Sequence, residues 1–473
     1  MATLQVNNPR TGVADYQFDA DTPQQVATQV ERAREAQHRW AAASLAERAT
    51  LIQAFADAIE HHGEAIRAAL THDTGRKRIS GEELEAVFHM AHGHAANAPK
   101  VFAEIKGPSS NVPGVDFVQQ YVPYGVVGVI SPWNFPLVLS FIDALPALLA
   151  GNTVVIKPSE VTPRFLEPLM KAINGVPGLE GVISFVRGAA ETGQALIDNV
   201  DLVVFTGSIP TGRKIAEAAA RNLVPCFLEL GGKDPAVVLA GADLDRAATS
   251  IVRSAVYNSG QVCYAIERVY VEASAHDEFV SLLVDKCKAL QINYPQVDRG
   301  DIGPFIHAPQ ARIVKQQLDD AVAKGAKILC GGELIERDGG VWMEATVVTD
   351  VDHGMVLMTE ETFGPVIPVM SVRDAKHAVA MANDTVFGLS GAVFADSIDC
   401  ATEIAAQINA GGVSINDTEL PRAITLDAEK QAFGQSGTGG SRYGTATMLR
   451  YVRKKALIRN HGAVKPLDVL AEL

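Results

Sequence analysis

The sequence predicts an α/β protein whose first large unit is a parallel sheet with helices on its faces. Five short apolar segments follow one another in the chain, and segments suited to helices, such as residues 164–174 and 212–222, lie between them. Strand, helix and strand at this spacing are typical of parallel sheets. The expected strands are residues 126–130, 153–157, 182–186, 202–205 and 226–230.

The first 100 residues are expected to be helical. Thr22 and Ser44 each stand three residues before a Gln or Glu, which is the pattern of a capping box at a helix start. Gly63 and Gly75 are plausible helix ends. Residues 117–130 follow with β-rich composition and a central Pro-Tyr-Gly turn, so a strand or hairpin is expected there.

A second α/β region is predicted after Gly231 and Gly232. It begins with a helix over 243–258, and further alternation continues to 411–416. A chain of 473 residues is longer than one hydrophobic core supports, which also indicates two or more domains.

Composition excludes several classes of function. The formal charge of −14 and the absence of a basic stripe argue against a nucleic-acid partner. No segment reaches the roughly 18 apolar residues of a membrane span, and the N-terminus does not resemble a secretion signal, so we expect a cytoplasmic protein without a membrane partner. Five widely spaced cysteines are expected to be free thiols. The histidines and cysteines lack metal-ligand spacing, so no metal site is predicted.

The carboxyl ends of the expected strands carry the residues that point to chemistry. Asn134 follows the first strand, Lys157 ends the second, Gly207 and Ser208 follow the fourth, and Glu229 lies in the fifth. Parallel sheets bind ligands at this edge. Each residue also has a structural interpretation: Asn134 as a helix cap, Lys157 as a solvated strand end, and Glu229 as the partner of a Lys or Arg.

Cys263 presents the same choice. Free cysteines are usually small buried hydrophobes, yet Cys263 follows a polar, flexible run, residues 258–261, and precedes an apolar β-rich segment. That context is typical of a loop that delivers a thiol to a strand edge.

The glycine-rich segments do not match the common nucleotide-binding loops. Residues 207–212 resemble a phosphate-binding loop, but the lysine is displaced by one position and the Mg-binding hydroxyl is missing, which argues against a triphosphate hydrolase. A helix that starts near Pro210 could offer backbone N–H groups to a diphosphate, although an ordinary strand-to-helix turn explains the segment equally well. No G-x-G-x-x-G fingerprint precedes a suitable helix.

Six short motifs in order resemble the aldehyde dehydrogenase superfamily over nearly the full length of the chain. They are PWNFP at 132–136, KPSE at 157–160, FTGS at 205–208, LELGGK at 228–233, GQVC at 260–263 and EETFGPV at 360–366. The resemblance implies a Rossmann-like cofactor domain, a second α/β catalytic domain and a small β oligomerisation ribbon.

The resemblance also implies a catalytic role for three residues. Cys263 would attack the aldehyde carbon, and its thiolate fraction must then exceed that of an ordinary thiol. Asn134 and the Cys263 backbone N–H would hold the oxyanion. Glu229 would be the general base that hydrolyses the thioester to a carboxylic acid, and its presence favours hydrolysis over transfer of the acyl group to coenzyme A.

By the same likeness the cofactor is NAD, with NADP possible. Lys157 and Glu160 would lie on the adenosine ribose, where a carboxylate repels a 2′-phosphate. The expected cofactor residues are Trp133, Lys157, Ser159, Glu160, Gly207, Ser208, Glu361 and Phe363.

The resemblance divides the chain into three parts. Residues 1–104 and 124–231 would form the NAD(P)-binding domain, and residues 232–440 the catalytic domain. Residues 105–123 and 441–473 would form the oligomerisation ribbon and C-terminal tail, so a homodimer or homotetramer is expected.

The substrate is expected to be an aliphatic or aromatic apolar aldehyde. Phe135, Leu139, Val262 and Tyr264 would line a mainly apolar pocket, although Arg422 could instead favour an anionic substrate. Asp143 departs from the family pattern, because many relatives carry a lysine there.

Two other classes of protein remain as alternatives. A catalytically silent NAD-binding protein would be expected to lack Cys263 or Glu229, and both are present. A cysteine hydrolase without a cofactor would need a histidine partner for Cys263, and the six motifs contain none.

Overall fold

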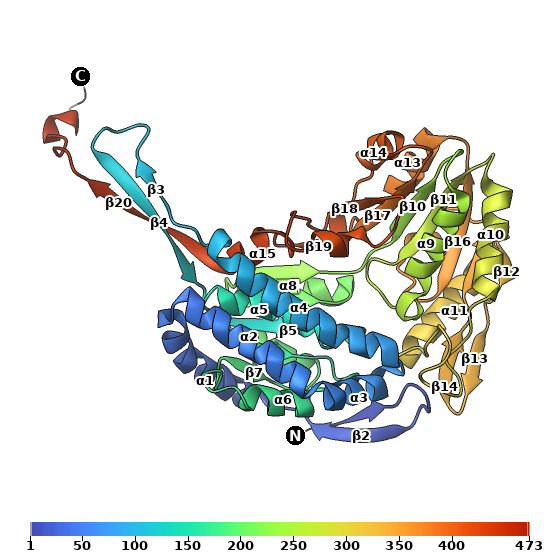
Figure 1. Ribbon diagram of the computed structural model, residues 1–473, viewed down its shortest axis with the longest axis horizontal. Helices are drawn as coiled ribbons and strands as arrows, with labels where there is room; N and C mark the ends of the chain where they lie inside the picture. Colours follow the sequence, from blue (N-terminus) through green and yellow to red (C-terminus); the bar gives the residue numbers. More distant parts are fainter. Residues whose placement is uncertain (1, 471, 473) are drawn as a thin grey trace.

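The computed structural model describes residues 2–470 and 472 and has the expected α/β architecture. Two units, each built on a mostly parallel sheet, lie side by side, and a narrow three-stranded arm projects from the first unit and ends near the C-terminus (Figure 1).

The chain begins with a hairpin that was not expected. Strands β1 (Thr3–Asn7) and β2 (Ala14–Asp19) pair antiparallel, so the prediction of helix throughout the first 100 residues is wrong for this segment. Both strands are short and mostly exposed, and they therefore lack the continuous apolar pattern of a core strand. Four helices follow: α1 (Pro23–Ala42), α2 (Leu45–His61), α3 (Gly63–Thr74) and α4 (Lys77–Val101).

The predicted helix starts are confirmed. Thr22 and Ser44 each form a complete capping box, at α1 and α2 respectively. Gly75 ends α3 in the left-handed region, at φ 68°, which glycine adopts without strain. Gly63 does not end a helix; it is the first residue of α3.

The first sheet has six strands and contains all five strands that the sequence predicts. The order is β19-β9-β8-β5-β6-β7, with β19 alone antiparallel. Because β6 and β8 lie on opposite sides of β5, the order reverses between β5 and β8, and such a switch point is where open α/β sheets bind ligands. The strands are β5 (Val126–Ile130), β6 (Thr153–Lys157), β7 (Ile183–Phe185), β8 (Leu202–Thr206), β9 (Cys226–Glu229) and β19 (Gly437–Thr438).

Strand β19 comes from the far end of the segment expected to be catalytic, so this part of residues 232–440 joins the first sheet. The connecting helices of this unit are α5 (Val138–Leu149), α6 (Leu166–Asn174), α7 (Ala190–Ile197) and α8 (Ile209–Arg221).

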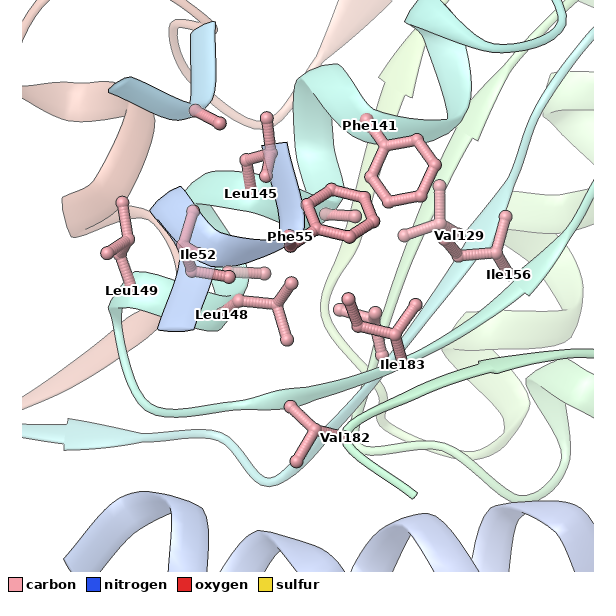
Figure 2. Close-up of a cluster of buried hydrophobic side chains, with 14 of the residues drawn as sticks. Ile52, Phe55, Val129, Phe141, Leu145, Leu148, Leu149, Ile156, Val182 and Ile183 are labelled. Atoms are coloured by element: carbon pink, nitrogen blue, oxygen red, sulfur yellow. The ribbon is translucent and has the colours of Figure 1, made fainter. Parts of the chain in front are cut away.

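The core of this unit packs α2 and α5 against the sheet. Phe55 and Phe141 are fully buried with ring centroids 5.0 Å apart, and Val129 and Ile156 of the sheet lie in the same cluster (Figure 2). Helix α5 begins just after the Asn134 loop, so this packing fixes the helix close to the carboxyl ends of the strands.

The second sheet has seven strands in the order β12-β15-β16-β11-β10-β17-β18, parallel except between β12 and β15. Its strands are β10 (Asp234–Val238), β11 (Ile266–Glu272), β12 (Lys327–Cys330), β15 (Thr346–Thr349), β16 (Val366–Val372), β17 (Ser390–Phe394) and β18 (Gly412–Ile415). The helices of this region are α9 (Leu244–Val256), α10 (His276–Lys288), α11 (Ala308–Ala323), α12 (Val356–Thr359), α13 (Ala375–Asn383) and α14 (Ile398–Ala405), with a small hairpin of β13 (Leu334–Arg337) and β14 (Gly340–Met343).

The arm consists of β3 (Ile105–Pro108), β4 (Val115–Pro123) and β20 (Val452–Asn460), which follows the short helix α15 (Ala446–Leu449). Strand β4 pairs with both neighbours, and β20 is an edge strand whose residues beyond Val452 are all exposed. Residues 117–130 therefore do not form a hairpin: β4 belongs to the arm and β5 to the first sheet.

In the part of the chain that the structure describes, no helix is long and apolar enough to cross a membrane, and no group of three or more His, Cys, Asp or Glu side chains could hold a metal ion. The five cysteines are free thiols.

Candidate active site

Two cavities meet at Cys263. The larger, about 390 Å³, is lined mainly by residues of α4, α5 and the segment around Arg422. The smaller, about 150 Å³, lies between the ends of β5, β8 and β9 and the segment around Glu361. Cys263 and Leu139 line both, so a molecule in either cavity lies beside the thiol.

A strained loop presents Cys263. Asn258 and Ser259 both have positive φ, 53° and 56°, in a short 3-10 turn (Tyr257–Gly260). Gly260 follows at φ 72°, and a side chain there would overlap the Gly364 carbonyl group. Non-glycine residues adopt this backbone only where the surroundings hold it in place, which often occurs at functional sites.

Cys263 is partly exposed, as a reactive residue must be, but its acidity is not as expected. Burial raises the pKa of the Cys263 thiol to about 12, the Glu361 carboxylate adds to the rise, and Arg442 opposes it. The expected enrichment in thiolate is thus opposed by the site, and the proton has to leave as the sulfur attacks.

Asn134 lies in the turn after β5 and is 3% exposed. Its side-chain amide donates to the Gln261 carbonyl at 3.0 Å, directly before the Val262-Cys263 segment. Asn134 does not cap a helix, because α5 begins at Val138 and the Glu83 carboxylate accepts from the first backbone N–H groups there. Within residues 2–470 and 472, the other amide hydrogen of Asn134 has no acceptor and is left for a ligand.

Arg76 contacts the turn that contains Asn134 and stabilises it. Its guanidinium donates to the Asn134 carbonyl at 2.5 Å, forms an ion pair with Glu83 at 3.1 Å and lies 4.7 Å from the centroid of the Phe135 ring. No motif in the sequence marks this residue. The only local signal is its place directly after Gly75 at a helix start.

Glu229 ends β9 and lines the smaller cavity together with Cys263. Its Oε1 lies 3.5 Å from Arg442 Nε and 3.4 Å from Arg450 Nη1. The interpretation of Glu229 as an ion-pair partner is therefore confirmed, and the same carboxylate also borders the cavity.

Five of the expected cofactor residues line the smaller cavity: Trp133, Gly207, Ser208, Glu361 and Phe363. The Trp133 and Phe363 rings meet edge to face with centroids 5.5 Å apart. Glu361 accepts from the Gly232 N–H at 3.3 Å, and burial raises the pKa of Glu361 to about 8. The sheet's switch point and this cavity coincide.

A buried ion pair fixes the Glu361 to Phe363 segment. Lys233 Nζ lies 2.8 Å from Glu267 Oε2, and both side chains are almost fully buried. The Glu267 carboxylate accepts from the backbone N–H groups of Thr362 and Phe363, each at 2.8 Å. The cavity wall is thus held by charged hydrogen bonds.

Lys157, Ser159 and Glu160 lie at and just after the end of β6, the neighbouring strand. The interpretation of Lys157 as a solvated strand end is wrong, because the residue is 5% exposed and burial lowers its pKa. Its Nζ lies 3.5 Å from Glu160 Oε2.

The larger cavity contains all four residues expected at a substrate pocket: Phe135, Leu139, Val262 and Tyr264. Arg422 lines it as well; its Nε donates to the Tyr264 hydroxyl at 2.7 Å, and its guanidinium lies 4.9 Å from the centroid of the Tyr257 ring. The cavity is therefore apolar near the thiol and also holds a cation.

Comparison with known proteins agrees with this arrangement. The aldehyde dehydrogenase family model matches residues 1–457. A "Putative succinate-semialdehyde dehydrogenase [NADP(+)] 2" of Mycobacterium ulcerans is 36% identical, over 96% of this chain and 88% of that protein.

Solved structures match equally well. The "Putative Aldehyde Dehydrogenase PutA" of Anabaena variabilis superposes with a TM-score of 0.96 at 47% identity, over 98% of this chain and 99% of that one. Betaine aldehyde dehydrogenase of Staphylococcus aureus in complex with NAD+ superposes with a TM-score of 0.92 at 30% identity, over 99% and 94% of the two chains. The chain belongs to the aldehyde dehydrogenase family and is an NAD(P)-dependent oxidoreductase.

Proposed function

We propose that this protein oxidises an aldehyde to the carboxylic acid through a thioester on Cys263. The observation that carries the proposal is the position of the thiol at the junction of two cavities. An aldehyde in the larger cavity and a nicotinamide in the smaller one would both lie beside the same sulfur.

The reaction begins when the Cys263 sulfur adds to the aldehyde carbon. Because the pKa of the thiol is raised, its proton passes to water as the sulfur adds to the carbon. The Asn134 amide and the Cys263 backbone N–H would stabilise the oxyanion, a contribution of about 10² to 10³ in rate per donor.

The residues of the smaller cavity suit a dinucleotide. The Ser208 hydroxyl donates to the Thr211 hydroxyl at 3.1 Å and does not cap a backbone N–H of α8, so the first N–H groups of this 13-residue helix are available for a diphosphate. Gly207 and Trp133 would line the groove. When bound, the nicotinamide supplies the hydride acceptor for the oxidation.

Glu229 would complete the reaction as a general base. Water adds to the acyl carbon, its proton passes to Glu229, the carbon–sulfur bond breaks, and the acid leaves Cys263 as a thiolate. General-base catalysis of this kind contributes about 10² to 10⁴ in rate. The presence of Glu229 supports hydrolysis over transfer of the acyl group to coenzyme A.

Glu160 supports a preference for NAD. Its carboxylate, oriented by Lys157, would accept from a ribose 2′-hydroxyl and repel a 2′-phosphate. The name of the M. ulcerans relative specifies NADP, so measurement of both cofactors is a direct test of this preference.

For the substrate we propose an aliphatic or aromatic aldehyde whose apolar body packs against Phe135, Leu139 and Val262. A second candidate is an aldehyde that carries a carboxylate. It is favoured by Arg422, which lines the cavity and has no carboxylate within 4.0 Å of its guanidinium in the described chain. The semialdehyde in the name of the M. ulcerans relative favours it as well.

The arm supports assembly of two or four copies. Strand β20 leaves one edge of the arm open, and Leu457 and Ile458 on it are exposed. An open edge strand readily pairs with another chain. The variant Ile458→Asp places a charge on this edge and should shift the protein toward monomer. Light scattering measures this shift and tests the assembly.

The experiment that tests the function is NADH or NADPH formation with apolar aldehydes and oxo acids, with Cys263→Ala and Glu229→Gln alongside. Turnover that is lost in Cys263→Ala supports the proposal, and the ranking of aldehydes identifies the substrate class. Cofactor binding without turnover of any aldehyde would favour a silent binding protein. Hydrolysis of an ester or amide by Cys263, with no NADH or NADPH formed from any aldehyde, would favour a cysteine hydrolase.

A further inference from the structure

A buried cluster of four charges lies behind the smaller cavity. Asp143 on α5 and Glu229 on β9 share two guanidinium groups, those of Arg442 and Arg450. The side chains of Asp143, Arg450, Arg442 and Glu229 are 1%, 5%, 9% and 14% exposed. Charges this deep in a protein must be balanced within the cluster, because water cannot screen them.

The two carboxylates are held very differently. Asp143 accepts from Arg442 Nη2 at 2.5 Å, from Arg442 Nε at 3.2 Å, from the Tyr451 hydroxyl at 2.9 Å and from Arg450 Nη2. Glu229 has only two long contacts, of 3.4 and 3.5 Å, and in the described chain both reach the same oxygen, Oε1. Asp143 therefore takes most of the attraction of both guanidinium groups.

Without the charge of Asp143, two cations would face the single carboxylate of Glu229. Both guanidinium groups would then turn toward it, and charge-assisted bonds would occupy both of its oxygens. A carboxylate clamped in this way has no free oxygen for a water molecule and is a poorer proton acceptor.

We propose that Asp143 is a positioning residue: it engages Arg442 and Arg450 so that Glu229 keeps one oxygen free for the water that hydrolyses the thioester on Cys263. This inference rests on the proposed function, because it assumes Glu229 to be the base. Asp143 itself lines neither of the two cavities that meet at Cys263.

The state of Asp143 agrees with this role. Burial would raise the pKa of Asp143, but the two guanidinium groups and the hydrogen bond from Tyr451 outweigh burial and hold the pKa below its ordinary value. The residue thus remains a carboxylate and keeps the cluster neutral.

The test uses p-nitrophenyl acetate, an activated ester that acylates a thiol without cofactor. An initial burst of nitrophenolate reports formation of the thioester, and the steady rate reports its hydrolysis. In Asp143→Asn the burst should keep its amplitude, while the steady rate should fall about tenfold, as expected for an impaired general base. The same split should appear between the NADH burst and kcat with an aldehyde.

Restoration of the charge balance separates positioning from a merely structural role. In the double variant Asp143→Asn/Arg442→Gln, Arg450 and Glu229 again balance, and the steady rate should recover most of the loss. The matched control is Asp201→Asn, which removes an aspartate paired with Arg34 at 2.6 Å near the opposite edge of the same sheet and should leave both phases unchanged.

Three results would overturn the inference. One is a steady rate of Asp143→Asn equal to that of the unmodified protein. Another is a proportional fall of burst and steady rate, and the last is a double variant slower than the single one. Ester hydrolysis by the unmodified protein that is undiminished in Cys263→Ala would instead overturn the proposed function, and this inference with it.

Discussion

The replacement of Arg76 by lysine tests how the oxyanion site is held. Arg76 is 6% exposed in its side chain and has three partners: the Glu83 carboxylate, the Asn134 carbonyl and the Phe135 ring. Lysine keeps the charge opposite Glu83. Its single ammonium group cannot also reach the Asn134 carbonyl and cover the ring.

The expected loss follows from these contacts. A hydrogen bond from a charged donor contributes about 1.5–3 kcal/mol, and a desolvated cation over an aromatic ring about 2 kcal/mol. We therefore expect Arg76→Lys to lower the free energy of unfolding by about 3 kcal/mol. If the displaced Asn134 amide keeps half of an oxyanion contribution of about 3 kcal/mol, kcat/KM falls about tenfold.

The assay measures kcat/KM and thermal unfolding on the same preparations. Arg164→Lys is the matched control, because Arg164 also pairs with buried aspartate, Asp73 at 2.6 Å, and lies 5.1 Å from the centroid of the Tyr16 ring, away from Cys263. Arg76→Lys should lose both stability and rate, and Arg164→Lys stability alone. Equal kcat/KM in the two variants would refute the positioning of Asn134 by Arg76.

Three further outcomes are expected. Because burial raises the pKa of Cys263 to about 12, its thiolate fraction should rise about tenfold per pH unit between pH 7 and 10. The rate of Cys263 alkylation by iodoacetamide, followed by mass spectrometry, should rise in the same way, and a plateau below pH 9 would contradict the raised pKa. Gly260→Ala should lower the free energy of unfolding by about 2 kcal/mol or more and abolish most of the activity, because the alanine methyl group would overlap Gly364. Normal activity would show that the loop is less constrained than described. Glu160→Gln should raise kcat/KM for NADP relative to NAD about fivefold, because the Glu160 carboxylate repels a 2′-phosphate a few Å away by about 1 kcal/mol. An unchanged ratio would mean that the ribose binds elsewhere.

Local sequence was sufficient wherever one short segment determines the structure. Continuous apolar runs predicted β5, β6 and β8 within a residue or two, and the hydroxyl caps at Thr22 and Ser44 located two helix starts. The hairpin of β1 and β2 is not predicted, although residues 8–12 include the turn residues Asn, Pro and Gly, because its strands lie on the surface and are rich in polar residues.

The candidate site was predictable as far as its motifs extend. Cys263, Glu229 and the cavity residues stand in short distinctive strings, and the structure brings them together. The contacts of Asp143 with Arg442 and Arg450 join residues about 300 positions apart, and no local pattern reports such a pairing. The acidity of Cys263 also depends on burial, which the sequence of its loop does not reveal.

The meeting of two cavities at Cys263 has a consequence for the order of events in turnover. Each cavity has its own lining, with only Cys263 and Leu139 in common, so occupancy of one leaves the other accessible. Under the proposed assignment, either reactant can bind first, and the acid product can leave before or after the reduced dinucleotide. An inert analogue of the aldehyde should then compete with aldehyde and act as a non-competitive inhibitor against the dinucleotide.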